Sequence, residues 1–104
     1  SLTAMAKEGG AVKLSWQPPT ETAAVGINLY RAQTSFDDVG EAVKINVNLV
    51  TAATFSDLPP EDGSWIYRAT TVDTAGNESE PSPDGPSYRT VATFPTGDGT
   101  TGRL

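Results

Sequence analysis

The stretch SWIYRATTVDTAGNES, residues 64–79, contains the longest alternating segment of the chain and the turn that follows it. Up to residue 73, large or β-branched side chains alternate with others, as in a β-strand with one face against a core. Four side chains would share that face: Trp65, Tyr67, Ala69 and Thr71. The segment then runs into Asp, Ala, Gly and Asn, of which Asp, Gly and Asn are favoured in turns. The stretch therefore predicts a strand followed by a tight hairpin connection.

The turn residues each have a geometric role in closing such a hairpin. Asp73 can accept hydrogen bonds from nearby backbone N–H groups. Gly76 can adopt a positive φ without a Cβ clash, and Asn77 tolerates that conformation. Asp73 is also the only acid between Thr70 and Asn77, whereas calcium takes roughly six to eight oxygen ligands. We therefore interpret this turn as a connection between strands and not as a metal or ligand site.

Six further segments alternate in a similar way, with turn residues between them. They are residues 2–6, 11–16, 27–33, 43–48, 53–58 and 87–93. In the second of these, Val12, Leu14 and Trp16 alternate with polar side chains, as expected of a half-buried strand. Helix signals are nearly absent. Seven short strands at this spacing predict an all-β sandwich or barrel.

Two of the segments carry more specific expectations. In residues 43–48, Val43, Ile45 and Val47 would lie on one face of a strand. In residues 53–58, Phe55 is the expected inward anchor. Both expectations rest on the two-residue period of side chains along a strand.

The composition excludes several classes of function. The chain has 13 acidic and 7 basic residues, a formal charge of −6, and no visible basic patch, which argues against nucleic-acid binding. No apolar run approaches the roughly 20 residues of a membrane span. There is no Cys and no His, so disulfides, Cys-based zinc sites and Ser-His or Cys-His nucleophilic pairs are excluded.

A chain of 104 residues is long enough for one small domain. We assign residues 1–93 to that domain. Residues 94–104 carry Gly, Thr and Asp with almost nothing apolar, and are predicted to be a flexible linker or C-terminal tail. The start of the sequence has no signal-peptide pattern, and we expect the chain to be a segment of a longer protein.

Three pieces of the sequence resemble a fibronectin type III domain when taken in order. They are LSWQPP at residues 14–19, INLYR at residues 27–31, and LPPEDGSWIYRATTVDTAGNESEPS at residues 58–82. The resemblance covers about residues 2–93. The D-x-A-G-N-x-S form of the turn is similar to bacterial or phage versions of the family.

The resemblance implies a seven-stranded antiparallel sandwich of the immunoglobulin-like type. The first, second and fifth strands would form one sheet and the third, fourth, sixth and seventh the other. Trp16 would be almost fully buried between the two sheets. The family's corner tyrosine, which follows a leucine by six residues, is replaced by Trp65, seven residues after Leu58. Because an indole N–H donates but does not accept, the corner hydrogen bond should differ or be missing.

The resemblance also implies a function. The expected role is a non-catalytic structural spacer that positions neighbouring domains of a larger protein, located extracellularly or on a cell or virion surface. The alternative is an accessory binding module for a polysaccharide or a surface protein. A fold alone does not decide between these roles.

Candidate site residues are few. Of the eight aromatic residues, Tyr30, Phe36, Tyr88 and Phe94 are the possible surface rings. Tyr30 and Tyr88 are the candidate binding residues, because both would face outward on the four-stranded sheet. The acids fall in loops without EF-hand spacing, so neither a metal site, a cofactor nor a catalytic pair is expected.

The last strand is expected to lie at a sheet edge. Pro81, Pro83 and Pro86 precede or enter it, and proline removes the N–H donors with which a second chain would pair. We therefore expect a monomer in isolation.

Overall fold

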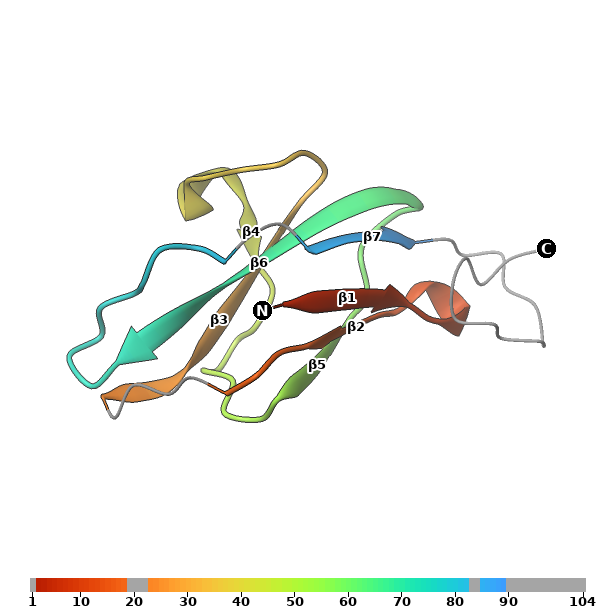
Figure 1. Cartoon of the computed structure of the whole chain (residues 1–104). Helices are drawn as coiled ribbons and strands as arrows, with labels where there is room; N and C mark the ends of the chain where they lie inside the picture. The colour runs from red at the N-terminus through yellow and green to blue at the C-terminus, as the bar shows by residue number, and fades with distance from the viewer. Residues whose placement is uncertain (1, 19–22, 83–84, 90–104) are drawn as a thin grey trace.

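The structure, a computed structural model, describes residues 2–18, 23–82 and 85–89, with the side chains of residues 88 and 89 left out of the description. Over these residues the chain forms seven strands in two antiparallel sheets that face each other (Figure 1). One sheet has three strands and the other has four. This confirms the predicted all-β sandwich and the predicted division of strands between its sheets.

The three-stranded sheet has the order β1-β2-β5. Its strands are β1 (Thr3–Ala6), β2 (Val12–Ser15) and β5 (Thr54–Asp57), and a short 3₁₀ turn, η1 (Glu8–Gly10), connects the first two. Leu14 stands opposite Ala4 on one side and Phe55 on the other. These three side chains all pack toward the core, so the period of two places one apolar row on the inner face.

The four-stranded sheet has the order β4-β3-β6-β7. Its strands are β3 (Ala24–Ala32), β4 (Val43–Lys44), β6 (Gly63–Asp73) and β7 (Gly85–Arg89), and η2 (Val39–Glu41) precedes β4. The two long central strands pair along almost their whole length, from Ala24 opposite Asp73 to Ala32 opposite Ile66. The predicted strand at residues 64–73 is thereby confirmed, and the one predicted at residues 27–33 is present but begins earlier, at Ala24, and ends at Ala32.

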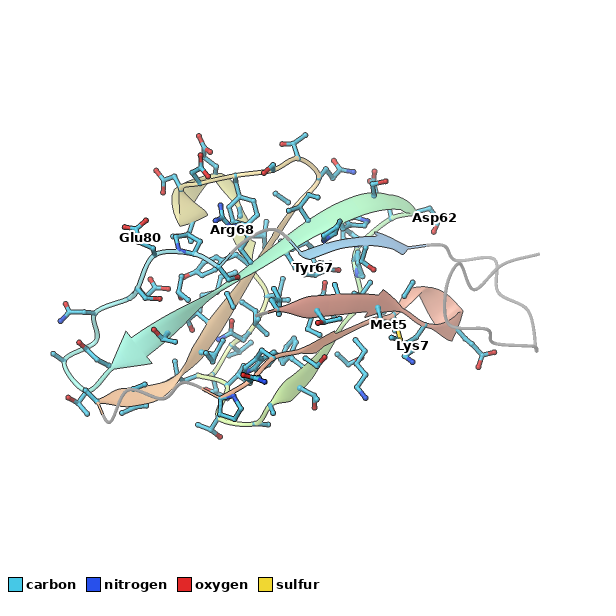
Figure 2. All side chains as sticks on the ribbon, viewed as in Figure 1. Met5, Lys7, Asp62, Tyr67, Arg68 and Glu80 are labelled. Carbon is cyan, nitrogen blue, oxygen red and sulfur yellow. The ribbon has the colours of Figure 1, made fainter. Side chains whose placement is uncertain are left out.

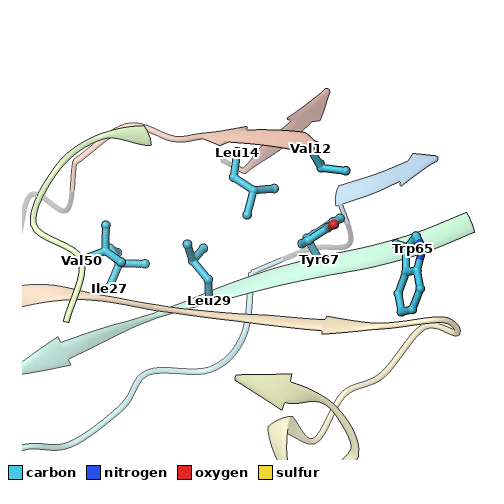
Figure 3. Packing of buried hydrophobic residues seen from close by; sticks show 7 residues of the cluster. All are labelled: Val12, Leu14, Ile27, Leu29, Val50, Trp65 and Tyr67. Atoms are coloured by element: carbon cyan, nitrogen blue, oxygen red, sulfur yellow. The ribbon is translucent and has the colours of Figure 1, made fainter. Parts of the chain in front are cut away.

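The core lies between the sheets and contains seven buried hydrophobic residues (Figure 3). They are Val12, Leu14, Ile27, Leu29, Val50, Trp65 and Tyr67. Phe55 packs against this cluster as predicted. Trp16 also packs against it but is only partly buried. The expectation that Trp16 is almost fully buried between the sheets is therefore wrong, because Trp16 lies where the space between the sheets is open beside Ile27 and Ala69.

The predicted strand over residues 43–48 is much shorter in the structure. The strand β4 ends at Lys44, and Val43 and Val47 are exposed, the latter at 93%. The reason is Asn46, which is buried and whose Oδ1 accepts the Leu29 backbone N–H at 2.8 Å. A side chain therefore takes the place of a ladder carbonyl, and the alternation of apolar residues does not mark a continuous strand here.

The first and last described strands run in the same direction. In Figure 1 the arrows of β1 and β7 lie near each other and point the same way. Their starts are adjacent, since a Cβ atom on Gly85 would lie 3.4 Å from the Leu2 side chain. Because Gly85 pairs with Tyr67 and Arg89 with Gly63, β1 starts beside the middle of β6, whereas β7 ends beside the start of β6.

Two expectations lie partly outside the described residues. The predicted tail at residues 94–104 and the end of the predicted last strand, residues 90–93, are not among them. Within the described ranges, none of the helical segments has the length and apolar character needed to cross a membrane.

Candidate functional site

The turn after β6 is a three-residue hairpin connection closed by backbone hydrogen bonds. The Gly76 N–H donates to the Asp73 carbonyl at 3.0 Å, and the Asp73 N–H donates to the Asn77 carbonyl at 3.0 Å. Gly76 has φ of 88°, the left-handed conformation that this kind of connection requires. The predicted tight turn is confirmed. Asn77, which would tolerate a positive φ, does not adopt one, since no described non-glycine residue does.

The Asp73 carboxylate is used within this turn. Its Oδ1 accepts the backbone N–H groups of Ala75 and Asn77, each at 2.9 Å, and its Oδ2 accepts the Asn77 amide at 3.3 Å. The bond from the Asn77 backbone is the main cause that holds the pKa of Asp73 below its ordinary value. Among the described residues, no group of three or more acidic side chains is placed to hold a metal ion.

Glu78, directly after the turn, ties it to the outer face of the four-stranded sheet. Its Oε2 accepts hydrogen bonds from Thr70 Oγ1 at 2.7 Å, from Asn28 Nδ2 at 3.2 Å and from the Tyr30 hydroxyl. The bond from Thr70 and then that from Tyr30 lower the pKa of Glu78. We call these four residues the Glu78 cluster.

Tyr30 therefore has a different role from the one expected of it. It lies on the outer face of the four-stranded sheet, since Leu29 and Arg31 on either side of it point inward, but only 6% of its surface is exposed. Burial first, and then the bond to Glu78, raise the pKa of Tyr30 to about 12. The prediction that Tyr30 is a surface ring is wrong. The second candidate, Tyr88, lies in β7 opposite Ser64, but its side chain is outside the described residues.

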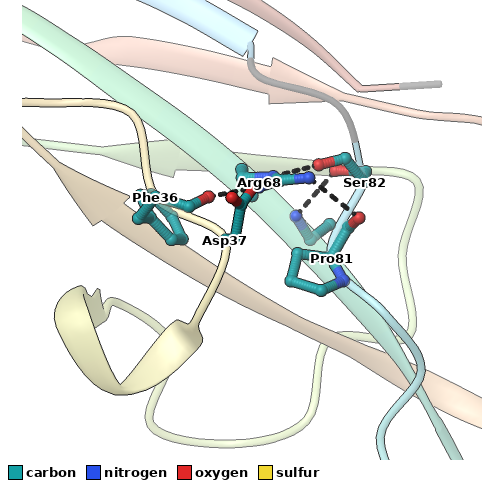
Figure 4. Close-up of polar contacts among 6 residues, drawn as sticks. Phe36, Asp37, Arg68, Pro81 and Ser82 are labelled. Carbon is teal, nitrogen blue, oxygen red and sulfur yellow. Dashed lines mark hydrogen bonds and ion pairs between the residues drawn. The ribbon is translucent and has the colours of Figure 1, made fainter.

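A second cluster covers the same face and depends on Arg68 (Figure 4). Its guanidinium donates to the carbonyl oxygens of Phe36, Ser82 and Pro81, and it pairs with Asp37 at 3.1 Å. It also lies 5.8 Å from the centre of the Phe36 ring. Phe36, expected as a surface ring, is 4% exposed. Arg68 thus joins the connection before η2 to the segment after the turn.

Two charged residues lie between the sheets, which the sequence reasoning missed. Arg31 Nη1 contacts Asp57 Oδ1 and Oδ2, each at 2.8 Å, and the Tyr67 hydroxyl donates to Asp57 Oδ2 at 3.0 Å. The guanidinium also lies 5.4 Å from the centre of the Trp65 ring. Burial raises the pKa of Tyr67. The alternation of side chains could have indicated this position. Asp57 is two residues after the inward-facing Phe55, and Arg31 is two residues after the inward-facing Leu29, so each charged residue shares a face with a core residue.

The corner between β5 and β6 keeps a hydrogen bond from an aromatic side chain to the backbone. The Trp65 indole Nε1–H donates to the Glu61 carbonyl at 3.1 Å. The bond is therefore present, in the direction an indole allows. Leu58, the leucine from which the corner position is counted, is 62% exposed, whereas Pro59 beside it is fully buried.

A hollow of about 270 Å³ lies beside the turn, lined in part by Asp73, Asn77 and Glu78. Both carboxylates already accept the hydrogen bonds described above. The hollow therefore offers a ligand few groups that are not engaged in holding the turn itself.

Two comparisons with known proteins found no match. No protein-family model matches the chain, and no curated protein matches it.

Proposed function

We propose that the chain is a fibronectin type III-like module that acts as a non-catalytic spacer between neighbouring domains of a larger protein. Two features of the fold support the proposed assignment to this family. The strands divide three against four in the order that the resemblance implies, and Trp65 donates to the backbone four residues upstream, as the corner tyrosine of such sandwiches does.

The observation that carries the spacer role is the shared direction of β1 and β7. Their starts are adjacent and both run the same way (Figure 1). The start of β1 and the end of β7 are therefore separated by about the length of β7. Neighbouring domains joined at these two points would be held apart by that length of the sandwich.

The covered outer face supports the same role. A spacer transmits orientation only if its own elements are fixed. The Glu78 cluster and the Arg68 contacts fix two connections on the four-stranded sheet, the one between β3 and β4 and the one between β6 and β7, so that the chain's own loops cover part of this face. The core between the sheets is closed in addition by the Arg31–Asp57 pair.

The proposal extends to location and partners. The form of the DTAGN turn favours an extracellular or virion-surface protein of bacterial or phage origin, with neighbouring domains of the same chain as partners. The absence of His and Cys from the sequence supports a non-catalytic module. Pro86 within the edge strand β7 supports a monomer, for which sedimentation at micromolar concentration is the test.

The spacer role is tested by placing labels at the start of β1 and at the end of β7. Because the chain has no Cys, cysteines introduced at Thr3 and Arg89 are unique labelling sites. We expect one narrow distribution of spin-label distances, unchanged when folded reporter domains are fused to both termini. A Gly/Ser linker of equal length is the matched control and should give a broad distribution. A broad distribution from the chain itself would overturn the spacer role.

A further inference from the structure

A hollow of about 190 Å³ opens between the two sheets beside Trp16. Its apolar lining comes from Leu2, Trp16, Ile27 and Ala69, which belong to both sheets or lie next to them. A second hollow, of about 130 Å³, is also lined by Trp16 and Ile27. We call the first of these the Trp16 hollow. Trp16, which the sequence places in the core, therefore lines two surface cavities.

The hollow exists because no strand continues along this part of β6. Between the turn and β7, the segment beside β6 uses serine hydroxyls in place of ladder carbonyls. Ser79 Oγ accepts the Thr71 N–H and Ser82 Oγ accepts the Ala69 N–H, each at 2.9 Å. The start of β1 is the neighbouring element across the gap, so Trp16 stays half-covered.

The rim of the Trp16 hollow carries two polar side chains that are not engaged elsewhere among the described residues. They are the amide of Gln17 and the carboxylate of Glu80, both on exposed residues. In Figure 2 Glu80 projects from the segment after the turn on the side away from β1 and β2, so its carboxylate reaches the hollow only by rotating toward it. Both side chains have several rotatable bonds and can turn toward a ligand. The Glu78 and Asp73 carboxylates differ, because both are already hydrogen-bonded within the fold.

From this arrangement we propose that the Trp16 hollow binds one pyranose unit of a polysaccharide. A sugar ring has a C–H face that packs on an indole, and hydroxyl groups that donate to a carboxylate and both donate to and accept from an amide. Trp16 would pack against the C–H face of the sugar, and Glu80 and Gln17 would form hydrogen bonds with its hydroxyl groups. This proposal goes beyond the spacer role and gives the alternative binding role a site other than Tyr30 and Tyr88.

A basic peptide is the competing occupant. A lysine side chain would also meet a tryptophan and a carboxylate. The amide of Gln17 favours the sugar, because an ammonium group has donors only and no acceptor for an amide N–H.

The test uses the two indole N–H signals of the chain, which has two tryptophans. The full chain labelled with ¹⁵N is titrated with a panel of soluble oligosaccharides of glucose, N-acetylglucosamine, mannose and xylose. We expect the Trp16 indole signal to shift saturably with one of them. The Trp65 signal should stay fixed, since its N–H is bonded to Glu61 in the core.

Variants of the rim separate binding from folding. Glu80→Gln and Gln17→Ala alter exposed side chains, and each should weaken the affinity about tenfold, the effect of one lost hydrogen bond to a ligand. Glu8→Gln is the matched control, because Glu8 is an exposed acid in η1, outside the hollow, and it should leave the affinity unchanged.

Three outcomes overturn the proposal. They are no shift with any sugar of the panel, a shift that Glu80→Gln and Gln17→Ala leave intact, or a salt-sensitive shift with oligolysine alone. The last would assign the hollow to a basic partner. None of them bears on the label distances that test the spacer role, so the two proposals fail separately.

Discussion

Asp57 on β5 accepts hydrogen bonds from Arg31 on β3 at 2.8 Å, and so joins the two sheets through a buried ion pair. The side chains are 8% and 13% exposed, respectively. The Tyr67 hydroxyl donates to the same carboxylate, and the Trp65 ring lies beside the guanidinium. Aromatic side chains of β6 therefore flank the ion pair between the sheets.

Removing one partner of this pair should be more damaging than removing both. Asp57→Ala leaves a buried guanidinium without its counter-charge and should lower the free energy of unfolding by about 3–5 kcal/mol. The double variant Arg31→Met, Asp57→Leu should lose less than the Asp57→Ala variant, because no charge is left uncompensated. Denaturant unfolding of the single variants Arg31→Met and Asp57→Leu and of the double variant measures the coupling. Strictly additive losses would show that the two residues do not act as a pair.

The two tryptophans should differ in their contribution to stability. Trp65 is 6% exposed and lies in the core, so Trp65→Ala should cost about 3–5 kcal/mol. Trp16 is only partly buried beside a hollow, so Trp16→Ala should cost clearly less. Thermal or denaturant unfolding of the two variants makes the comparison. Equal losses, or a larger one at Trp16, would contradict the packing described here.

Gly76 should tolerate asparagine better than alanine. No atom lies within 4 Å of a Cβ built at this position, so any cost comes from its φ of 88° and not from a clash. Gly76→Ala should therefore cost about 1–2 kcal/mol, the strain of a left-handed residue with a Cβ. Gly76→Asn is the matched control and should cost less, because asparagine adopts this conformation more readily. If both variants are as stable as the parent chain, the turn does not depend on the glycine.

The pKa of Tyr30 should depend on Glu78. Its folded pKa is about 12, above its ordinary value, so the folded state holds this proton more tightly than the unfolded state. The stability that Tyr30 contributes is then fully present below pH about 10 and is lost as the pH rises through about 12. Glu78→Gln should lower the pKa of Tyr30, because an acceptor carboxylate and its charge are removed. Asp73→Asn, in the same hairpin, is the control and should leave it in place, as followed by NMR of the tyrosine ring.

Calcium should not stabilise the chain. Asp73 is committed to the backbone of its own turn, and no described acidic group has the number of ligands that calcium needs. A calcium titration followed by thermal unfolding should leave Tm unchanged. A rise in Tm that Asp73→Asn abolishes would make the turn a metal site.

The alternation of side chains predicts the sheets well wherever a strand has partners on both sides. The long strands β3 and β6 follow the pattern because one face of each packs on the core. The pattern fails at β4, since an edge strand needs only a few ladder bonds and Asn46 replaces one of them with its side chain. Nothing in the local sequence distinguishes that asparagine from an outward-facing one.

The candidate site is harder to predict, because it depends on contacts between distant segments. Tyr30 is covered by Glu78, 48 residues away, and Phe36 is held by Arg68, 32 residues away. A period of two assigns Tyr30 to the outer face, which is correct, but does not say whether a loop folds over that face. The inward position of Asp57 was readable from its phase, but a charged residue on a core face is unexpected unless a partner is known.

The shared direction of β1 and β7 has a mechanical consequence. Tension applied at Thr3 and Arg89 would pull the two strands in opposite directions along their own axes. The hydrogen bonds of β1 with β2 and of β7 with β6 would then be loaded together in shear, and not broken one after another as in peeling. A sandwich that is pulled through β1 and β7 is therefore suited to bear a force. The Arg31–Asp57 pair would resist the sliding of one sheet over the other.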